Sequence, residues 1–165
     1  RTLTQANATV QRDGKMVVAM VGLPARGKTY IARALRRHLC WMGIRAAIFN
    51  VGNVRREILG PAQRHSFFSA TNPVGLQQRH DMAVAAFRQM VRALHTKVDV
   101  AIFDATNSTT DRRLWLKESI RKCFGGKEST GEHTKGAGSG KEKVKLLFVE
   151  SICTEETIVR KNIRD

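Results

Sequence analysis

Long apolar runs and cysteine motifs are both missing from this sequence of 165 residues, and acidic residues are few. No 18 apolar residues follow one another, so we expect no membrane-spanning helix and no membrane partner. The three cysteines, Cys40, Cys123 and Cys153, form no CxxC pair, which argues against disulfides and a zinc site. We therefore expect them to be small buried hydrophobic side chains in a reducing, cytoplasmic location.

The shortage of acidic residues leaves a strong positive charge. Twenty-nine Lys and Arg against fourteen Asp and Glu give a formal net charge of +15 and a pI near 10.7. Such a balance predicts an anionic partner of one of three kinds: a phosphate metabolite, a nucleic acid or an acidic surface. Aromatic residues make up only 6% of the chain, which is few for stacking bases, so a nucleic-acid partner is disfavoured.

Strand and helix signals alternate along the chain, which is long enough for one domain. After a polar leader over 1–15, we expect a domain over 16–165 that is truncated at its C-terminal end. A surface insertion over 125–143 holds six of the thirteen glycines. The expected strands cover 16–21, 46–50, 98–103 and 144–149. One helix is expected to begin near residue 28, a second to cover 75–95, and two more to begin near 108 and 155. A short helix is expected at 54–59, in an otherwise irregular stretch over 51–73. This alternation predicts an α/β fold with a mostly parallel sheet.

Apolar residues at helical spacing mark the expected core faces of the three longer helices. They are Ile31, Leu35, Leu39 and Met42 in the first, Ala83, Phe87, Met90 and Leu94 in the second, and Leu114, Trp115 and Ile120 in the third. Gly43 stands where a left-handed cap would end the first helix. Ser108 and Asp111 form an S-x-x-D start signal for the third.

A complete G-x-x-x-x-G-K-T sequence stands between an expected strand and an expected helix, which is the context of a P-loop. Its members are Gly22, Leu23, Pro24, Ala25, Arg26, Gly27, Lys28 and Thr29. In such a loop the backbone approaches phosphate closely, the lysine reaches the β and γ phosphates, and the threonine hydroxyl ligates Mg²⁺. The sequence therefore predicts a site for ATP and Mg²⁺, and the context disfavours the alternative of a glycine turn with a surface lysine.

Asp104 ends the apolar segment VDVAIFD, where a P-loop enzyme needs a carboxylate near the metal or the attacking hydroxyl. The alternative carboxylate, Asp99, should lie at the far edge of the sheet, and an N-cap or turn role for Asp104 stays open. The polar cluster Ala105-Thr106-Asn107 follows at the carboxyl end of the strand, where open α/β sheets bind ligands.

Arginines gather at the same edge of the expected sheet. Arg55 and Arg56 follow the second strand, Arg79 lies early in the long helix, and Arg112 and Arg113 lie in the first turn of the next helix. Guanidinium groups match phosphate oxygens in pairs, so we predict a second anion site beside the P-loop, with a solvated helix face as the alternative. The five histidines show no metal spacing and no nucleophile partner, and we assign them no role.

The segments GLPARGKTYIARAL, FNVGNVRRE and FDATNSTTDRR together resemble the kinase domain of the 6-phosphofructo-2-kinase/fructose-2,6-bisphosphatase family, in its N-terminal part. The resemblance implies a three-layer P-loop NTPase fold like that of the nucleoside-monophosphate kinases. It also implies transfer of the γ-phosphoryl group of ATP to the 2-hydroxyl of fructose 6-phosphate. A homodimeric parent with a bisphosphatase domain would fit the same family.

Carried over position by position, the resemblance implies that Lys28 and Asp104 are catalytic and that Thr29 and Asp104 hold the metal. The expected sugar-phosphate residues are Arg55, Arg79, Thr106 and Arg112. The expected nucleotide-binding residues are Gly22, Leu23, Pro24, Ala25, Arg26, Gly27, Lys28, Thr29, Tyr30 and Asn162. Asn162, the expected adenine contact, rests on the resemblance alone.

The chain departs from the family pattern in several places. The usual FNVGEYRR reads FNVGNVRR, with Asn53 and Val54 at the changed positions, which bears on the shape of the sugar pocket. No RHGE-type phosphohistidine motif is present, and the family continues past Asp165 with parts of both pockets, so we expect these residues alone to be weakly active or inactive. Two alternatives remain, a P-loop polynucleotide or RNA-end kinase and a nucleotide-binding module without turnover.

Overall fold

The computed structural model describes residues 14–60, 65–69, 71–125 and 144–164, and strands and helices alternate along them. The strands are β1 (Lys15–Val21), β2 (Ala46–Asn50), β3 (Val100–Asp104) and β4 (Val144–Glu150). The helices are α1 (Lys28–Trp41), α2 (Val51–Leu59), the short 3₁₀ turn η1 (His65–Phe68), α3 (Pro73–Thr96), α4 (Thr110–Phe124) and α5 (Glu156–Arg164). All four expected strands are confirmed to within a few residues.

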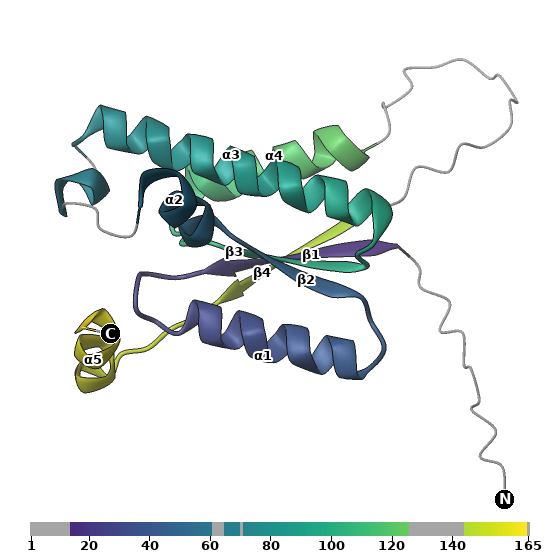
Figure 1. The fold of residues 1–165 in the computed structure, drawn as a ribbon, viewed down its shortest axis with the longest axis horizontal. Coiled ribbons are helices and arrows are strands. Elements are labelled where there is room, and N and C mark those ends of the chain that lie inside the picture. The colour runs from purple at the N-terminus through teal and green to yellow at the C-terminus, as the bar shows by residue number, and fades with distance from the viewer. Residues whose placement is uncertain (1–13, 61–64, 70, 126–143, 165) are drawn as a thin grey trace, which may run out of the picture.

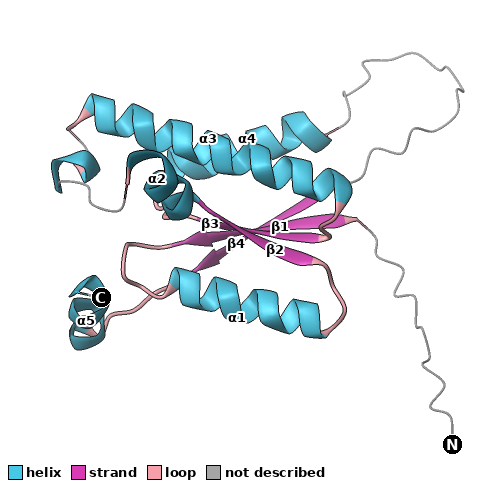
Figure 2. Ribbon diagram, in the orientation of Figure 1, coloured by secondary structure: helices cyan, strands magenta, loops and turns pink. Residues whose placement is uncertain are grey.

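The four strands form one parallel sheet in the order β2-β3-β1-β4. Helices α2, α3 and α4 lie on one face, and α1 lies on the other (Figure 1). The same view coloured by secondary structure shows the sheet edge-on between two helical layers (Figure 2). The predicted α/β fold with three layers is therefore confirmed.

The core is divided by the central strand β1, whose side chains alternate between the two faces. Val17 and Ala19 join the larger cluster under α3 and α4, whereas Val18 and Met20 join a small cluster on the α1 side. The predicted face of α3 lies in the larger cluster: Ala83, Phe87, Met90 and Leu94 are all buried.

The predicted faces of α1 and α4 are partly wrong. Ile31 is 37% exposed and Met42 is 55% exposed, because α1 covers only the small cluster and its one buried residue is Ala32. In α4 the buried line is Leu116, Ile120 and Phe124, spaced four residues apart, and Leu114 lies outside it.

Helix starts also differ from the prediction, because short polar side chains cap the helices. Asn50 accepts a hydrogen bond from the backbone N–H of Asn53, so α2 begins directly after β2 where we expected an irregular stretch. The start of α4 is capped by Thr109, one residue after the predicted Ser108. Gly43, with φ of 75°, does follow α1 in the left-handed conformation.

The prediction of buried cysteines is wrong. Cys40 and Cys123 are exposed and Cys153 is partly exposed, and all three thiols are free. Most of the predicted leader and insertion, at 1–13 and 126–143, lies outside the described residues. Within the described parts of the chain, no helix combines the length and the apolar character needed to cross a lipid bilayer.

Gly22, the first residue after β1, is a point of close approach between two strand ends. Its φ is 137°, and a Cβ built on it would lie 2.6 Å from the backbone oxygen of Ser151, just after β4. The backbone N–H of Ser151 in turn donates to the carbonyl of Val21 at 2.8 Å. A side chain at residue 22 would therefore push the β1 and β4 ends apart.

We expect Gly22→Ala to lower the free energy of unfolding by about 3 kcal/mol or more, because backbone must move to admit the methyl group. The matched control is Gly43→Ala, where φ is also positive but no atom lies within 4 Å of the added Cβ. It should cost about 1–2 kcal/mol, from the left-handed conformation alone. Urea unfolding of both variants measures the difference, and equal losses would contradict the close approach.

Candidate active site

The loop between β1 and α1 has the backbone shape of a phosphate-binding loop. Gly22 and Gly27 have φ of 137° and 80°, and Ala25 also has a positive φ, of 61°. The backbone N–H of Gly22 donates to the carbonyl of Thr106 at 3.0 Å, which fixes the loop against the end of β3. Helix α1 begins directly after Gly27 with no side-chain cap, so its first N–H groups take no side-chain partner and are suited to an anion.

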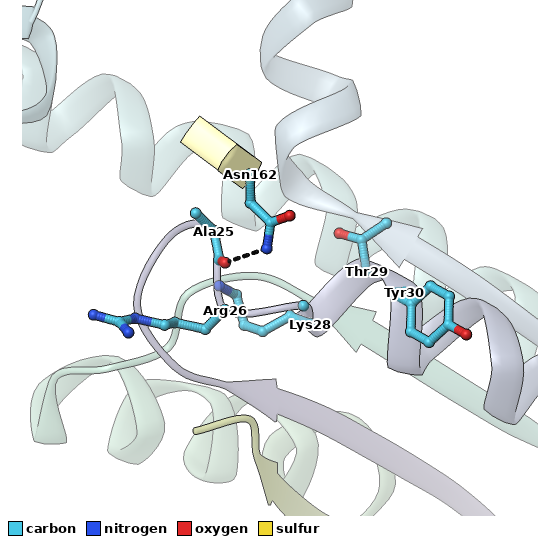
Figure 3. Close-up of a pocket in the computed structure, with 7 residues that line it drawn as sticks. Ala25, Arg26, Lys28, Thr29, Tyr30 and Asn162 are labelled. Atoms are coloured by element: carbon cyan, nitrogen blue, oxygen red, sulfur yellow. Dashed lines mark hydrogen bonds between the residues drawn. The ribbon is translucent and has the colours of Figure 1, made fainter. Parts of the chain in front are cut away.

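A cavity of about 450 Å³ opens beside this loop. It is lined by Ala25, Arg26, Gly27, Lys28, Thr29, Tyr30 and Asn162. Figure 3 shows the amide of Asn162 directed at the loop, where it donates to the Ala25 carbonyl at 3.0 Å. Helix α5 thus brings Asn162 to a loop 137 positions earlier in the chain.

Lys28 is half-buried at the first position of α1, and its ammonium donates to the carbonyl of Leu23 at 2.6 Å. Burial lowers the pKa of Lys28 from its ordinary value, and the nearby Asp104 partly opposes this shift. An anion bound in the loop would stabilise the ammonium form further, so the site favours a negatively charged ligand.

Asp104, at the end of β3, is the buried carboxylate of the site, with 2% of its surface exposed. Its Oδ2 accepts hydrogen bonds from the Thr29 hydroxyl, at 2.8 Å, and from the Asn50 side-chain amide. A hydroxyl and a carboxylate are the hard oxygen ligands that Mg²⁺ prefers, so this pair fits the ion. The described residues hold no group of three His, Cys, Asp or Glu suited to a metal. Mg²⁺ commonly takes only one or two carboxylates, and phosphates and water complete its shell.

The loop after β3 is held to the P-loop strand by Asn107. Its side-chain amide donates to the carbonyl of Met20 at 2.8 Å, and its backbone has a positive φ of 44°. Arg113 donates to the carbonyls of Asn107 and Ser108, at 3.1 and 2.7 Å. Arg113 therefore holds this loop, although the sequence placed it among the candidates for an anion site.

Ser151 joins the end of β4 to the P-loop, and sequence reasoning gave no signal for it. It is buried, and its hydroxyl donates to the carbonyl of Arg26. The guanidinium of Arg26 donates in turn to the carbonyl of Cys153. These two contacts connect residues more than 120 positions apart, so only the folded chain reveals them.

Three of the predicted arginines form a continuous line across α2, α3 and α4. The Arg55 guanidinium lies 5.3 Å from the centre of the Phe68 ring, and the next residue, Ser69, accepts a hydrogen bond from Arg79 at 3.2 Å. Arg112 donates to the backbone carbonyl of Arg79 at 3.4 Å. Burial and the positive charge of Arg79 both lower the pKa of Arg112.

The arginine line has no acidic counterpart within the described part of the chain. Among the residues that the structure describes, no carboxylate lies within ion-pair distance of Arg55, Arg79 or Arg112. The Nε of Arg55 is buried and has no hydrogen-bond partner within the same residues. Partly buried cations without counter-ions are suited to bind an anion.

The remaining predicted residues lie at the same edge of the sheet but differ in exposure. Thr106 is exposed, and Tyr30 lines the cavity although 78% of its surface is exposed. Asp99 lies at the opposite edge, as predicted, and it forms an ion pair there with Arg45. At the changed positions of the family pattern, Val54 is buried in the core, and Asn53 is exposed and accepts a hydrogen bond from Arg56. Neither change removes a member of the arginine line.

Solved structures share this fold at low sequence identity. The APS kinase CysC of Mycobacterium tuberculosis, in complex with AMPPNP and APS, matches 90% of this chain and 69% of its own chain. The TM-score is 0.56 and the identity 13%. The Pnkp1/Rnl/Hen1 RNA repair complex matches 98% of this chain and 40% of its own, with a TM-score of 0.53 and 18% identity. These likenesses confirm the P-loop kinase fold.

Sequence comparison is more specific. A 6-phosphofructo-2-kinase/fructose-2,6-bisphosphatase of Arabidopsis thaliana is 36% identical over 155 residues, which are 93% of this chain and 18% of that protein. The human 6-phosphofructo-2-kinase/fructose-2,6-bisphosphatase 4 is 38% identical over 148 residues, which are 89% of this chain and 28% of that protein. The chain thus spans less than a third of the length of these relatives. Since the family model of 6-phosphofructo-2-kinase matches residues 4–165, the chain belongs to the 6-phosphofructo-2-kinase family.

Proposed function

We propose that this chain is part of an ATP-dependent kinase that phosphorylates the 2-hydroxyl of fructose 6-phosphate, giving fructose 2,6-bisphosphate. The observation that carries the proposal is that two cationic regions, the P-loop and the arginine line, lie at one edge of the sheet. The buried Asp104 lies at the same edge. A kinase that joins ATP to a phosphorylated acceptor needs two such regions and a carboxylate near the metal or the acceptor hydroxyl. The family membership supports the same reaction.

The nucleotide would lie along the loop and its cavity. The residues that would hold it are Gly22, Leu23, Pro24, Ala25, Arg26, Gly27, Lys28, Thr29, Tyr30 and Asn162. Thr29 and Asp104 would hold Mg²⁺, which neutralises charge on the transferring phosphoryl group when bound. Asn162, whose amide already lies against the loop, would contact the adenine.

The sugar phosphate would bind at the arginine line. Arg55, Arg79 and Arg112 would take its 6-phosphate, and Thr106 would contact the sugar beside Asp104. A phosphate placed there supplies the counter-ion that these arginines lack among the described residues. Its binding is then favoured by charge and by the paired N–H groups of each guanidinium.

In the proposed transfer, the acceptor 2-hydroxyl oxygen forms a bond to the γ-phosphorus, and the bond from that phosphorus to the bridging oxygen of ADP breaks. Lys28 holds the β and γ phosphates and stabilises the charge that develops on the leaving ADP. The carboxylate of Asp104 orients the hydroxyl and accepts its proton. The residues thus act mainly through positioning and charge.

The bisphosphatase activity named in the relatives would need residues outside this sequence, because no RHGE-type motif occurs within it. We place the proposed reaction in the cytoplasm. The three free thiols, two of them exposed, support a reducing compartment.

The full-length protein, offered ATP and Mg²⁺ with one acceptor at a time, tests this proposal. The acceptors are fructose 6-phosphate, fructose 1-phosphate, glucose 6-phosphate and a 5′-hydroxyl oligonucleotide. We expect ATP consumption with fructose 6-phosphate in clear preference to the others. Preference for the oligonucleotide would support the polynucleotide-kinase alternative, and ATP binding without turnover would support a non-catalytic module.

Lys28→Met should reduce kcat/KM by at least about 100-fold in the full-length protein, because a charge on the transferring phosphates is lost. Folding should be nearly unchanged, since the lysine contributes one hydrogen bond within a loop. Steady-state kinetics and a thermal melt measure the two effects. Lys117→Met, on the exposed side of α4, is the control and should behave as wild type.

Asp104→Asn should lower kcat by at least about 100-fold while the Thr29 hydroxyl keeps a neutral acceptor of the same shape. ATP affinity in the absence of Mg²⁺, measured by calorimetry, should change little. Glu118→Gln, an exposed residue of α4, is the control. A variant with full kcat would refute the role of Asp104 in the transfer.

Arg79→Ala should raise the KM for fructose 6-phosphate by about 10- to 100-fold, and Arg112→Ala should do the same, because a charged hydrogen-bonded contact is lost. The KM for ATP should stay near its wild-type value in both. Arg88→Ala, on the exposed side of α3, is the control. If the two variants instead weaken oligonucleotide binding with a steep salt dependence, the arginine line serves a polyanion.

A further inference from the structure

The Arg112 guanidinium contacts an imidazole nitrogen, a backbone carbonyl and an indole ring. Its Nη1 lies 3.3 Å from Nδ1 of His80, and its Nη2 donates to the carbonyl of Arg79 at 3.4 Å. The guanidinium carbon lies 5.1 Å from the centre of the Trp115 ring. The guanidinium is therefore fixed in direction by contacts from both α3 and α4.

The two aromatic partners also hold each other. The His80 and Trp115 rings meet edge to face, with centroids 5.3 Å apart and planes at 69°. Trp115 also packs edge to face against the buried Phe87, with centroids 5.6 Å apart. The position of the Arg112 guanidinium is thus connected to the main core through two successive ring contacts.

The contact with His80 has a defined direction when it is a hydrogen bond. A guanidinium has five N–H donors and no acceptor, so Arg112 is the donor and Nδ1 of His80 is the acceptor. Two of the five donors are taken by His80 and Arg79, and three remain for a ligand. The partners therefore orient the guanidinium and leave most of its N–H groups available to a ligand.

None of these three partners is a carboxylate, and this has an electrostatic consequence. A carboxylate at residue 80 would fix Arg112 equally well but would cancel its charge, and an anion would then have to compete with it. An imidazole nitrogen and an indole face leave the charge in place. Because Arg79 adds a second positive charge nearby, the position stays attractive for an anion.

We propose that His80 and Trp115 are positioning residues that aim the Arg112 guanidinium at the phosphate group of the acceptor and so determine the acceptor's affinity. Neither residue touches the reacting atoms. The identity of the acceptor rests on the proposed function, whereas the aiming of Arg112 toward a phosphate group does not.

A fluorescence titration tests the proposal directly, because the chain has two tryptophans and one of them lies under Arg112. Trp41→Phe removes the other, which is exposed at the end of α1 and whose ring lies near that of His38. In the full-length protein with this change, and with any tryptophan outside these 165 residues also replaced by Phe, both fructose 6-phosphate and inorganic phosphate should change Trp115 emission saturably. Arg112→Ala should abolish the change.

Substitutions at His80 separate its acceptor role from packing. His80→Ala should raise the dissociation constant for fructose 6-phosphate about 3- to 10-fold, the size expected for one lost hydrogen bond. His80→Asn, whose side-chain oxygen can stand near the position of Nδ1, should restore most of the affinity. In steady-state assays the KM for fructose 6-phosphate should follow these constants, and kcat and the KM for ATP should not change.

A double-mutant cycle separates positioning from direct contact. If His80 acts only through Arg112, His80→Ala should add nothing in the Arg112→Ala protein, as measured by KM for fructose 6-phosphate. Independent, additive losses would show that His80 contacts the ligand itself and would overturn the positioning role. Trp115→Leu should raise the same KM, and Trp115→Phe should preserve it. If Trp115→Leu does not fold, the His80 series decides alone.

The outcomes for the two proposals are distinguishable. A wild-type protein that does not phosphorylate fructose 6-phosphate refutes the proposed function, and the inorganic phosphate titration still tests the aiming of Arg112. Equal affinities of the wild type and His80→Ala for inorganic phosphate would overturn the positioning role. So would a His80→Asn variant as weak as His80→Ala.

Discussion

The buried carboxylate of Asp104 is the contact on which the rest of the site depends. It accepts hydrogen bonds from Thr29 at the start of α1 and from Asn50 at the end of β2. Burial of a carboxylate is costly without such partners, so these bonds stabilise both the charge and the arrangement of three elements around it. The start of α1 and the end of β2 are thereby held against the same carboxylate oxygen, Oδ2.

Among the described residues, Arg55, Arg79 and Arg112 form no ion pair, and the sequence has few acidic residues. Asp99 pairs with Arg45 at the opposite edge of the sheet, away from the P-loop and the arginine line. At the carboxyl edge the arginines contact aromatic rings and backbone carbonyls instead. The arginines at this edge therefore repel one another, and a bound anion would reduce that repulsion.

Close packing at the strand ends sets the shape of the loop. Gly22 leaves no room for a side chain against Ser151, and the Ser151 hydroxyl and the Arg26 guanidinium tie the P-loop to the segment after β4. On the other side, Asn107 ties the loop after β3 to Met20 of β1. The backbone of the P-loop is therefore held from both neighbouring strands, and a loop fixed in this way loses little freedom when a ligand binds.

The sequence by itself determined what depends on local chemistry. It predicted the P-loop motif, the alternation of strands and helices, and the apolar face of α3. Each of these depends on residues only a few positions apart in the chain. Only the tertiary structure decided which faces of α1 and α4 were buried, as Ile31 and Leu114 show, because burial depends on what covers a face. It also decided the roles of Ser151, Trp115 and His80, whose partners lie up to 125 positions away. A lone histidine carries no signal in a sequence, and it gains one only when folding places an arginine against its ring nitrogen.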